Sequence, residues 1–565
     1  MERKKRLEII GWFFFVCFGL IFLRLAFLQV KQAPEFKRKA RDKNYRVIFQ
    51  PAPRGTIYDR EGRPLAVSIP YYDLSAEPKY LKEAPAEVAK KIAPIIGESP
   101  AKLTAEFSSG KGFILLRRRI PYDDYIAVKK LAIEKIGFQE TFSRSFPEGK
   151  IASHVVGLVD VDGKGLEGIE KQYNQFLSGQ DGKISILRDG KGNPIPSLNE
   201  GISARPGQDL FLTIDIKVQR ILEEELEKVF KEYSALGAAG IVLDADNGEV
   251  LALANRPTYD PNPPVTSPLN YRRNRSVTDI FEPGSIFKIV TAAAGLEEGV
   301  VKPEDNIFCE NGKYFVRNHT IHDTHPYGMI TFREVIAKSS NIGSVKVGFK
   351  LGEERMYQYA TAFGFGKKTG INLPGEASGV LRPVSQWSDY SMTAIPFGHE
   401  VSATVVQCAA ALGAIVNGGN LYQPYLVLKG VRDRGGRFTP DRKPVLVRRV
   451  ISQATADTLV SILVDVASEE GTARWAAIPG YRVGGKTGTA RKVENGRYSR
   501  TKYVASFAGF IKNPARDLVI YVMVDEPRGV SYYGGMVVGP AFNRIGQRTL
   551  LALGIAPDQE IKQTQ

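Results

Sequence analysis

The amino terminus most strongly constrains how this chain folds, because it holds an apolar run long enough to cross a lipid bilayer. The run extends from Ile9 to Val30 and contains a single charged residue, Arg24. A helix rises about 1.5 Å per residue, so this run spans a hydrocarbon core of about 30 Å, and an arginine near its end can reach the interface. We therefore predict a short tail over residues 1–8, an uncleaved transmembrane anchor over residues 9–30, and a large region on one side of the membrane.

Two other interpretations of the run are weaker. A cleaved signal peptide would need an A-x-A-like site after the run, where Arg24-Leu25-Ala26-Phe27 stands instead. A helix buried in a soluble core is disfavoured by the length of the run and by its basic flanks. Because Lys and Arg are enriched both at Arg3–Arg6 and at Lys31–Lys43, the positive-inside rule does not decide the orientation.

The charge of the chain is concentrated beside this run. Lys and Arg total 77 against 61 Asp and Glu, a net charge of +16, and residues 1–60 alone hold fourteen basic and five acidic residues. A basic end beside an apolar run favours a membrane surface over nucleic acid, for which the sequence has no zinc-finger, RRM or helix-turn-helix pattern. Three cysteines, Cys17, Cys309 and Cys408, are too few for a disulfide framework, so packing alone must hold the fold.

The chain after the anchor divides into two parts. Residues 45–200 mix short strand-like runs such as Tyr45–Phe49 with amphipathic helical stretches such as Glu83–Ile96, and they carry no catalytic grouping. Within this part, Arg54–Ala66 places a charged Glu-Gly turn between two possible strands, which we interpret as a structural clasp. A turn-rich stretch around Pro206-Gly207-Gln208 marks a boundary, and we expect a second domain over residues 205–555.

The second part has strand patterns near its beginning and near its end. These patterns predict that strands from both regions join one sheet. Lys217–Tyr233 is an amphipathic helix rich in Glu and Leu. Ala238–Leu243 and Glu249–Asn255 flank an Asn-Gly pair, which allows the positive φ angles of a tight hairpin turn. Two more alternating strands, Tyr503–Phe510 and Leu518–Val524, would complete one antiparallel sheet.

A serine and a lysine three residues apart open an apolar helix. Ser285 and Lys288 follow a Pro-Gly pair and lead into Ile289–Gly299, so both side chains lie on one face of the first turn and can touch. A desolvated lysine amine near other cations can be neutral enough to deprotonate the hydroxyl and make it a nucleophile. The same spacing occurs at three places that open no such helix: Ser99/Lys102, Ser108/Lys111 and Ser499/Lys502.

Two further motifs supply groups that such a nucleophile needs. Ser339 and Asn341 offer a hydroxyl and an amide that can relay a proton and hold a substrate amide. Lys486-Thr487-Gly488-Thr489 is predicted to be an edge strand with a cation and hydroxyls for a carboxylate, and with glycines that let a ligand approach the backbone. A second Lys-Thr-Gly, at Lys368–Gly370, runs into Pro374-Gly375, which ends any strand.

In this order, Ser285-x-x-Lys288, Ser339-x-Asn341 and Lys486-Thr487-Gly488 resemble the three motifs of the penicillin-binding proteins and serine β-lactamases. The likeness covers nearly the whole chain and is strongest to class B penicillin-binding proteins of the division-specific, FtsI type. The other segments that carry it are the anchor, Arg54–Ala66, Leu212-Thr213-Ile214-Asp215, Gly364-Phe365-Gly366, Leu373-Pro374-Gly375-Glu376 and Tyr533-Gly534-Gly535. The resemblance implies an α/β transpeptidase domain, an antiparallel sheet flanked by helices, carried on an elongated β-rich pedestal or dimerisation-like module.

The resemblance also implies a reaction for these residues. Ser285 would attack the penultimate D-Ala carbonyl of a peptidoglycan stem peptide and release the terminal D-Ala. Lys288 would be the base, and Ser339 and Asn341 would relay protons and hold the acyl amide. An amine of a neighbouring stem peptide would complete the cross-link, and β-lactams would acylate the same serine.

The remaining motif would bind substrate. Lys486, Thr487 and Thr489, on either side of Gly488, would hold the substrate carboxylate, and backbone N–H groups of Ser285 and Thr489 would form the oxyanion hole. We predict no cofactor and no metal for this site.

Location and partners follow from the same resemblance. The amino terminus would lie in the cytoplasm and the rest outside the cytoplasmic membrane, in a single-pass protein of septal cell-wall synthesis. A SEDS-type glycan polymerase and other division proteins would be its partners. Three alternatives stay open: an elongation-type class B transpeptidase, a membrane-tethered β-lactamase and a non-catalytic scaffold.

Possible metal ligands gather between the serine and the Ser339 motif, namely Cys309, His319, His322, Asp323 and His325. The spacing His-x-x-His-x-x-His fits no standard zinc site, so we interpret this segment as a polar loop over the cleft. His399-Glu400 is likewise no metalloprotease motif, because H-E-x-x-H would need a histidine at Ala403.

Overall fold

The computed structural model describes residues 2–187, 200–262, 265–428, 430–432, 438–440, 444–494, 496–529 and 531–560. The chain forms two compact units. The first comprises Met1–Arg54, Pro70–Phe142 and Ser178–Gly207, and the second comprises Gly55–Ile69, Ser143–Leu177 and Gln208–Gln565. Each unit is therefore assembled from segments that are distant in the sequence.

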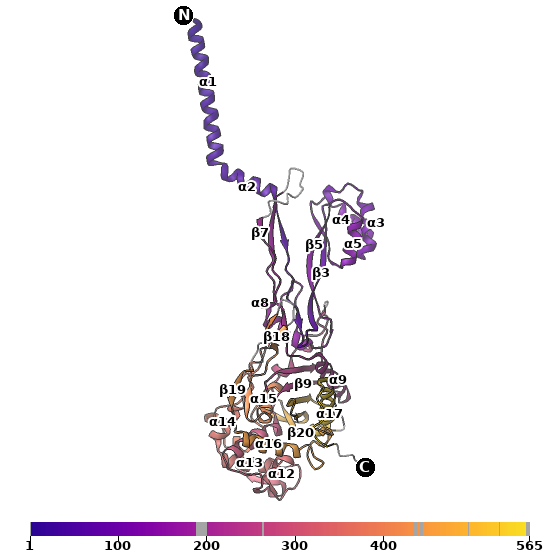
Figure 1. Ribbon diagram of the computed structural model, residues 1–565, viewed down its shortest axis with the longest axis vertical. Helices are drawn as coiled ribbons and strands as arrows, with labels where there is room; N and C mark the ends of the chain where they lie inside the picture. The colour runs from indigo at the N-terminus through magenta and orange to yellow at the C-terminus, as the bar shows by residue number, and fades with distance from the viewer. Residues whose placement is uncertain are drawn as a thin grey trace. The chain divides into compact units, whose positions relative to one another are not determined.

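The first unit begins with the apolar helix that the sequence predicts. α1 (Glu2–Ala26) continues through a π-helical turn, η1 (Phe27–Lys31), and α2 (Ala33–Asn44) follows (Figure 1). Among the residues described, Glu2–Lys31 is the one helix long and apolar enough to cross a membrane, and none of its apolar stretch is buried. Its length and composition fit the predicted anchor.

The remainder of the first unit combines strands with a small helical core. Its elements are β1 (Tyr45–Gln50), α3 (Pro85–Ile96), α4 (Pro100–Phe107), β4 (Ile114–Ile120), α5 (Tyr122–Lys130), β6 (Gly182–Leu187) and β7 (Glu200–Ile202). β1, β6 and β7 form an antiparallel sheet. The helices enclose a core around Leu74, Ile92 and Leu116. The strand predicted from Tyr45 and the helix predicted up to Ile96 are both confirmed.

The predicted clasp is a strand, a turn and a second strand. β2 (Ile57–Tyr58) pairs antiparallel with the start of β3 (Pro64–Ala76) and parallel with β8 (Leu210–Leu212). The fully buried Asp59 organises the turn, because its Oδ1 accepts the backbone N–H groups of Glu61 at 2.9 Å and Arg63 at 2.8 Å. The clasp therefore joins segments of the second unit that are far apart in the sequence.

A five-stranded antiparallel sheet forms the centre of the second unit. Its order is β10-β9-β22-β21-β20, so strands from the two ends of the domain lie side by side, as the sequence predicts. The strands are β9 (Gly237–Asp244), β10 (Val250–Arg256), β20 (Arg482–Glu494), β21 (Arg497–Lys512) and β22 (Leu518–Asp525). Every residue of β9 and β22 is buried, which is typical of a sheet covered on both faces.

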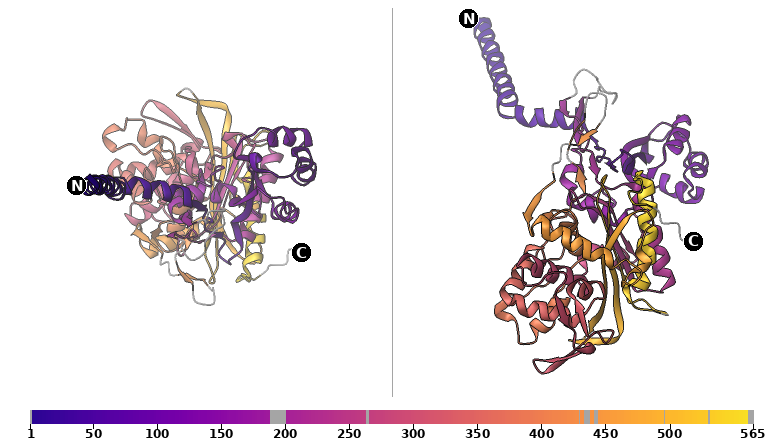
Figure 2. Two further views of the ribbon diagram at one scale, coloured as in Figure 1. Left: turned by 90° about the horizontal axis from the view of Figure 1, so that it is seen from above. Right: turned by 60° about the horizontal axis from the view of Figure 1, so that its bottom comes forward.

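Helices cover both faces of this sheet. α9 (Ile216–Glu232) and α17 (Gly534–Leu553) pack together on one face, and α15 (Val405–Val416) packs on the other (Figure 1). Figure 2 shows α17, in yellow, along one side of the sheet, whereas the helices of this unit that are named next lie on the opposite side. Those helices are α11 (Lys288–Glu297), α12 (Phe332–Ala337), α13 (Asn341–Leu351), α14 (Glu353–Ala362) and α16 (Gln453–Asp465). The α/β fold predicted for this domain is confirmed.

The contact between α17 and the sheet gives a first test of this packing. A Cβ at Gly509 on β21 would lie 2.3 Å from Cε2 of Phe542 on α17. Gly509→Ala should therefore lower the free energy of unfolding by about 1–3 kcal/mol, because the ring has to move within a full core. Denaturant unfolding measures the change. Gly112→Ala is the control, since nothing lies within 4 Å of its added carbon, and equal losses in both variants would contradict the packing described.

Candidate active site

Ser285 lies in one 3-10 turn, η5 (Gly284–Phe287), that runs directly into α11. The sequence predicts an α-helix from this point, and the structure has one tighter turn before that helix begins. The other members of the turn are buried, whereas Ser285 is partly exposed. It lines a cavity of about 480 Å³, hereafter the Ser285 cavity, together with residues of both other motifs: Ser339, Asn341, Thr487 and Thr489. Three distant segments of the sequence therefore meet around one hydroxyl.

Lys288 is fully buried, and the second motif binds its amine. Nζ donates to the Ser339 carbonyl oxygen at 2.5 Å and to Asn341 Oδ1 at 2.8 Å, and it lies 3.1 Å from Ser339 Oγ. The sequence predicts that the Ser285 hydroxyl and this amine can touch. In the described part of the chain no hydrogen bond joins them, because three oxygen acceptors from residues 339–341 surround the amine.

The Ser339 hydroxyl lies between two lysine amines. Its Oγ is 3.1 Å from Lys288 Nζ and 2.8 Å from Lys486 Nζ, so a proton can pass between the amines through one oxygen. Ser339 has a φ of +61°, a left-handed conformation that costs a non-glycine residue free energy and recurs at functional sites. This conformation directs the chain from the end of α12 into the start of α13.

The third motif lies on β20, the edge strand of the sheet, as the sequence predicts. Thr487 Oγ1 is 3.0 Å from Thr472 Oγ1, and Thr489 Oγ1 accepts the Gly534 N–H at 3.0 Å. Because β20 is last in the strand order, its backbone offers an edge with which an extended peptide can pair. Thr487 and Thr489 of this edge strand therefore line the same cavity as Ser285.

Gly488 has a packing role that the sequence does not indicate. A Cβ here would lie 2.4 Å from Ser506 Oγ and 2.8 Å from Ile286 Cγ1. The glycine therefore lets β20 approach the turn that holds Ser285. The residue therefore sets the separation between Ser285 and the Lys486–Thr489 motif.

The competing motifs lie in other environments. Thr369 of the second Lys-Thr-Gly donates its N–H and its hydroxyl to Glu376 at 2.6 Å, within a loop. Lys102 forms an ion pair with Glu98 on an exposed helix face. Among the described residues that line the Ser285 cavity, none comes from these alternative motifs.

Burial changes the protonation of the two lysines. Burial lowers the pKa of Lys288 to about 7, while Asp323 and Cys309 act in the opposite direction. Burial, reinforced by the positive charge of Lys288, holds the pKa of Lys486 well below its usual value. Two amines that share one hydroxyl and repel each other's charge favour a state in which one is neutral and one is protonated. A general base and a carboxylate-binding cation need this combination.

The segment between Ser285 and Ser339 supports the second motif from outside. Asp323 accepts the N–H groups of Asn341 at 2.5 Å and Ile342 at 3.1 Å, and the hydroxyl of Ser340 at 2.6 Å. From the sequence, Asp323 is only one of several possible metal ligands. Its neighbours in the sequence do not indicate the contact with residues 340–342, because the fold creates that contact. Within the residues described, no three His, Cys, Asp or Glu side chains are grouped to hold a metal ion.

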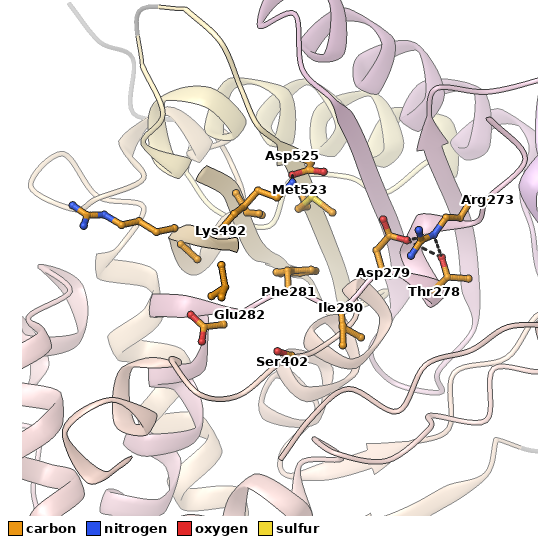
Figure 3. A pocket seen from close by; sticks show the side chains of 14 residues that line it. Arg273, Thr278, Asp279, Ile280, Phe281, Glu282, Ser402, Lys492, Met523 and Asp525 are labelled. Carbon is orange, nitrogen blue, oxygen red and sulfur yellow. Dashed lines mark hydrogen bonds and ion pairs between the residues drawn. The ribbon is translucent and has the colours of Figure 1, made fainter. Parts of the chain in front are cut away.

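A second cavity, of about 330 Å³, lies further along β20 and is hereafter the Glu282 cavity (Figure 3). Ala490–Val493, which follow Thr489 directly, line it, as do Ile280 and Glu282. Two ion pairs border it: Lys492 with Asp525 at 2.8 Å, and Arg273 with Asp279 at 2.6 Å. Both cavities therefore adjoin consecutive residues of the same strand.

Glu282 and His399 lie between the two cavities. Its carboxylate is 2.6 Å from His399 Nδ1, and it accepts the Glu400 N–H at 2.9 Å and the Tyr498 hydroxyl at 3.1 Å. His399 lines the Ser285 cavity, whereas Glu282 lines the other one. This pair therefore forms part of the wall between them.

Comparison with known families agrees with this geometry. A family model described as "Penicillin binding protein transpeptidase domain" matches residues 238–547, which include all three motifs. A model described as "Penicillin-binding Protein dimerisation domain" matches residues 49–212.

Curated relatives match almost the whole chain. The probable peptidoglycan D,D-transpeptidase PenA of Neisseria gonorrhoeae is 34% identical over 99% of this chain and 95% of its own length. The peptidoglycan D,D-transpeptidase FtsI of Escherichia coli K12 is 33% identical over 99% of this chain and 94% of its own length. Stage V sporulation protein D of Bacillus subtilis is 34% identical over 98% of this chain and 86% of its own length.

Solved structures show the same fold. A peptidoglycan synthetase from Bifidobacterium adolescentis matches with a TM-score of 0.74 and 26% identity, over 92% of this chain and 98% of its own. Penicillin-binding protein 3 from Mycobacterium tuberculosis, in complex with aztreonam, matches with a TM-score of 0.68 and 27% identity, over 92% of this chain and 100% of its own. The chain belongs to the class B penicillin-binding proteins, the serine-type D,D-transpeptidases of peptidoglycan.

Proposed function

We propose that this enzyme cross-links stem peptides through an acyl-enzyme on Ser285 during septal cell-wall synthesis. The observation that carries the catalytic part is the hydroxyl of Ser339, held between the amines of Lys288 and Lys486 in the cavity that Ser285 lines. This arrangement supplies a nucleophile, a base of suitable pKa and a cation within one small volume.

The proposed reaction has two steps. Lys288, as the neutral amine, takes the Ser285 proton, and Oγ bonds to the penultimate D-Ala carbonyl carbon. The bond to terminal D-Ala then breaks, and the leaving amine receives the proton, with Ser339 as relay. Backbone N–H groups of Ser285 and Thr489 would stabilise the oxyanion, and Asn341 would hold the acyl amide. An amine of a second stem peptide attacks the ester, forms the cross-link and restores the hydroxyl.

The motif on β20 orients the donor peptide. Lys486 and the hydroxyls of Thr487 and Thr489 would hold the terminal carboxylate, which leaves the scissile carbonyl near Ser285. Residues upstream of the D-Ala pair would then run antiparallel to β20 and arrive at Ala490–Val493, in the Glu282 cavity. Peptide residues beyond the D-Ala pair should therefore contribute to recognition.

A bulky residue in the Glu282 cavity tests this path. Ile280 is 45% exposed on its wall, so Ile280→Trp fills space without opening the core. The kcat/KM for a stem pentapeptide donor should fall about tenfold, a loss of about 1.4 kcal/mol of transition-state stabilisation, whereas an acetylated D-Ala-D-Ala donor should be unaffected. Val445→Trp, at a position 44% exposed that does not line this cavity, is the control. Equal losses for both donors would contradict the proposed path.

The septal role rests on the resemblance to FtsI-type enzymes along the whole chain. We infer that residues 9–30 anchor it with the tail 1–8 in the cytoplasm, that residues 45–200 are a non-catalytic pedestal, and that residues 205–555 are a periplasmic transpeptidase domain. A SEDS-type glycan polymerase and other division proteins would bind through the anchor and the pedestal. The sporulation relative supplies a second candidate role, in spore cell-wall synthesis.

Depletion of the protein in its host distinguishes these roles. Filamentous cells with unfinished septa are the expected result. Rounded cells would indicate an elongation enzyme, and normal growth with defective spores would indicate a sporulation enzyme. A fluorescent penicillin tests the chemistry: stable labelling is expected, transient labelling would indicate a β-lactamase, and absence of labelling a scaffold.

A further inference from the structure

Asp323 is the one carboxylate that contacts the Ser339–Asn341 motif directly among the residues described. It follows β13 (His319–His322), and its backbone N–H donates to the Gly312 carbonyl oxygen at 3.1 Å. Its Oδ1 accepts the N–H groups of Asn341 and Ile342, the first two residues of α13, and its Oδ2 accepts the Ser340 hydroxyl. The carboxylate thus satisfies the helix N-terminus and interacts with its dipole.

The same segment orients the side chain of Asn341. Its Nδ2 donates to the His322 carbonyl oxygen at 2.8 Å, which turns Oδ1 toward Lys288 Nζ, also at 2.8 Å. Main chain and side chain of Asn341 are therefore both held by residues 322 and 323. Displacement of Asp323 would displace the amide that accepts from the base.

Asp323 also acts on Lys288 through its charge. The titratable groups that face this buried amine are Lys486 on β20, and Asp323 and Cys309 from the segment before α12. A nearby negative charge stabilises the protonated amine against the cost of burial. The charge of Asp323 therefore opposes the lowering of the Lys288 pKa that burial causes.

We propose that Asp323 is a positioning residue of the transpeptidase reaction, which holds the Ser339–Asn341 turn against Lys288 and faces that amine with a compensating charge. The proposal deepens the proposed function, because it rests on Lys288 as the base. It goes beyond the three motifs, since it assigns a role to a loop residue outside them.

The test is the pH dependence of acylation by penicillin, measured by stopped flow on the full-length protein in detergent. Asp323→Asn keeps an acceptor of the same shape but removes the charge. Because only the neutral amine is active, the wild-type rate should rise with pH through about 7. Without the opposing carboxylate the pKa of Lys288 falls, so the midpoint of this rise should move down by roughly one pH unit. The plateau rate should also fall, since Asn341 is held less firmly.

Asp323→Glu and Ser340→Ala separate charge from position. Both keep the carboxylate, so both should lower the plateau rate while the midpoint stays at the wild-type value. Asp305→Asn removes a carboxylate of the same segment that caps the Lys302 N–H at 2.9 Å, and it should change neither quantity.

Three results would overturn the proposal. One is an unchanged midpoint in a folded Asp323→Asn variant, which would leave Asp323 as a helix cap alone. Another is a midpoint shift of equal size in Asp323→Asn and Asp323→Glu. The third result applies if Asp323→Asn does not fold: a plateau rate in Asp323→Glu equal to that of the wild type would show that the position of the carboxylate does not matter. Acylation that persists without Lys288 would instead overturn the proposed function itself.

Discussion

Replacement of Ser285 by alanine is expected to abolish covalent labelling by penicillin and to lower transpeptidation by at least roughly 10³-fold. In the proposed reaction the oxygen of this hydroxyl forms the ester, and no other side chain of the 3-10 turn before α11 (Gly284–Phe287) carries a hydroxyl. The turn itself should survive, because its buried members and the bond from the Gly284 N–H to Gly398 remain. Intact-protein mass spectrometry after penicillin treatment measures the acyl-enzyme, and thermal unfolding verifies the fold.

Ser499→Ala is the matched control for this experiment. Ser499 precedes Lys502 with the same spacing, but its hydroxyl accepts from backbone N–H groups on β21. This variant should label as the wild type does. Stoichiometric addition of penicillin to the Ser285→Ala protein would place the nucleophile elsewhere.

Removal of the buried amine should have the second largest effect. Lys288→Met keeps the length of the side chain and removes the base, so acylation by penicillin should slow by about 10²–10⁴-fold across the pH range. The same change removes the positive charge that faces Lys486, so the pKa of Lys486 should rise toward its ordinary value. Stopped-flow acylation rates between pH 5 and 9 measure the slowing, and the rise through about pH 7 should disappear with Lys288.

Lys102→Met provides the control for Lys288→Met. Lys102 belongs to an alternative Ser-x-x-Lys pair but lies on an exposed helix face, paired with Glu98. It should leave the rate and its pH dependence unchanged. A Lys288→Met enzyme that acylates within about threefold of the wild-type rate would exclude Lys288 as the base.

Local patterns predicted the architecture of the second unit well. The two strands predicted on either side of Asn247-Gly248 appear as β9 and β10, but the connection is longer than a two-residue turn, since Leu243 pairs with Val250 and only Gly248 of the Asn-Gly pair has a positive φ. The two strands predicted near the end of the chain appear as β21 and β22, although both extend beyond the predicted limits. Hairpin turns and strand periodicity depend on neighbouring residues, which is why the sequence alone indicates them.

The motifs also predicted which segments meet, but not how they touch. The left-handed φ of Ser339 and the acceptors around Lys288 arise from packing between α11, α12 and α13, and no local pattern encodes them. The close approach of Gly488 to Ser506 and Ile286 was not predicted, because these neighbours are remote in the sequence. The contact of Asp323 with the Ser339–Asn341 motif was not predicted for the same reason, since its partners follow a whole strand and helix later.

The position of β20 at the margin of the sheet affects how a substrate arrives. A peptide that pairs with a marginal strand is added laterally, as one more strand, and needs no free terminus to thread through a tunnel. Both reacting peptides of a cell wall are tethered to long polymers. Lateral pairing with β20 would therefore let such tethered peptides enter the site without a free end of the polymer.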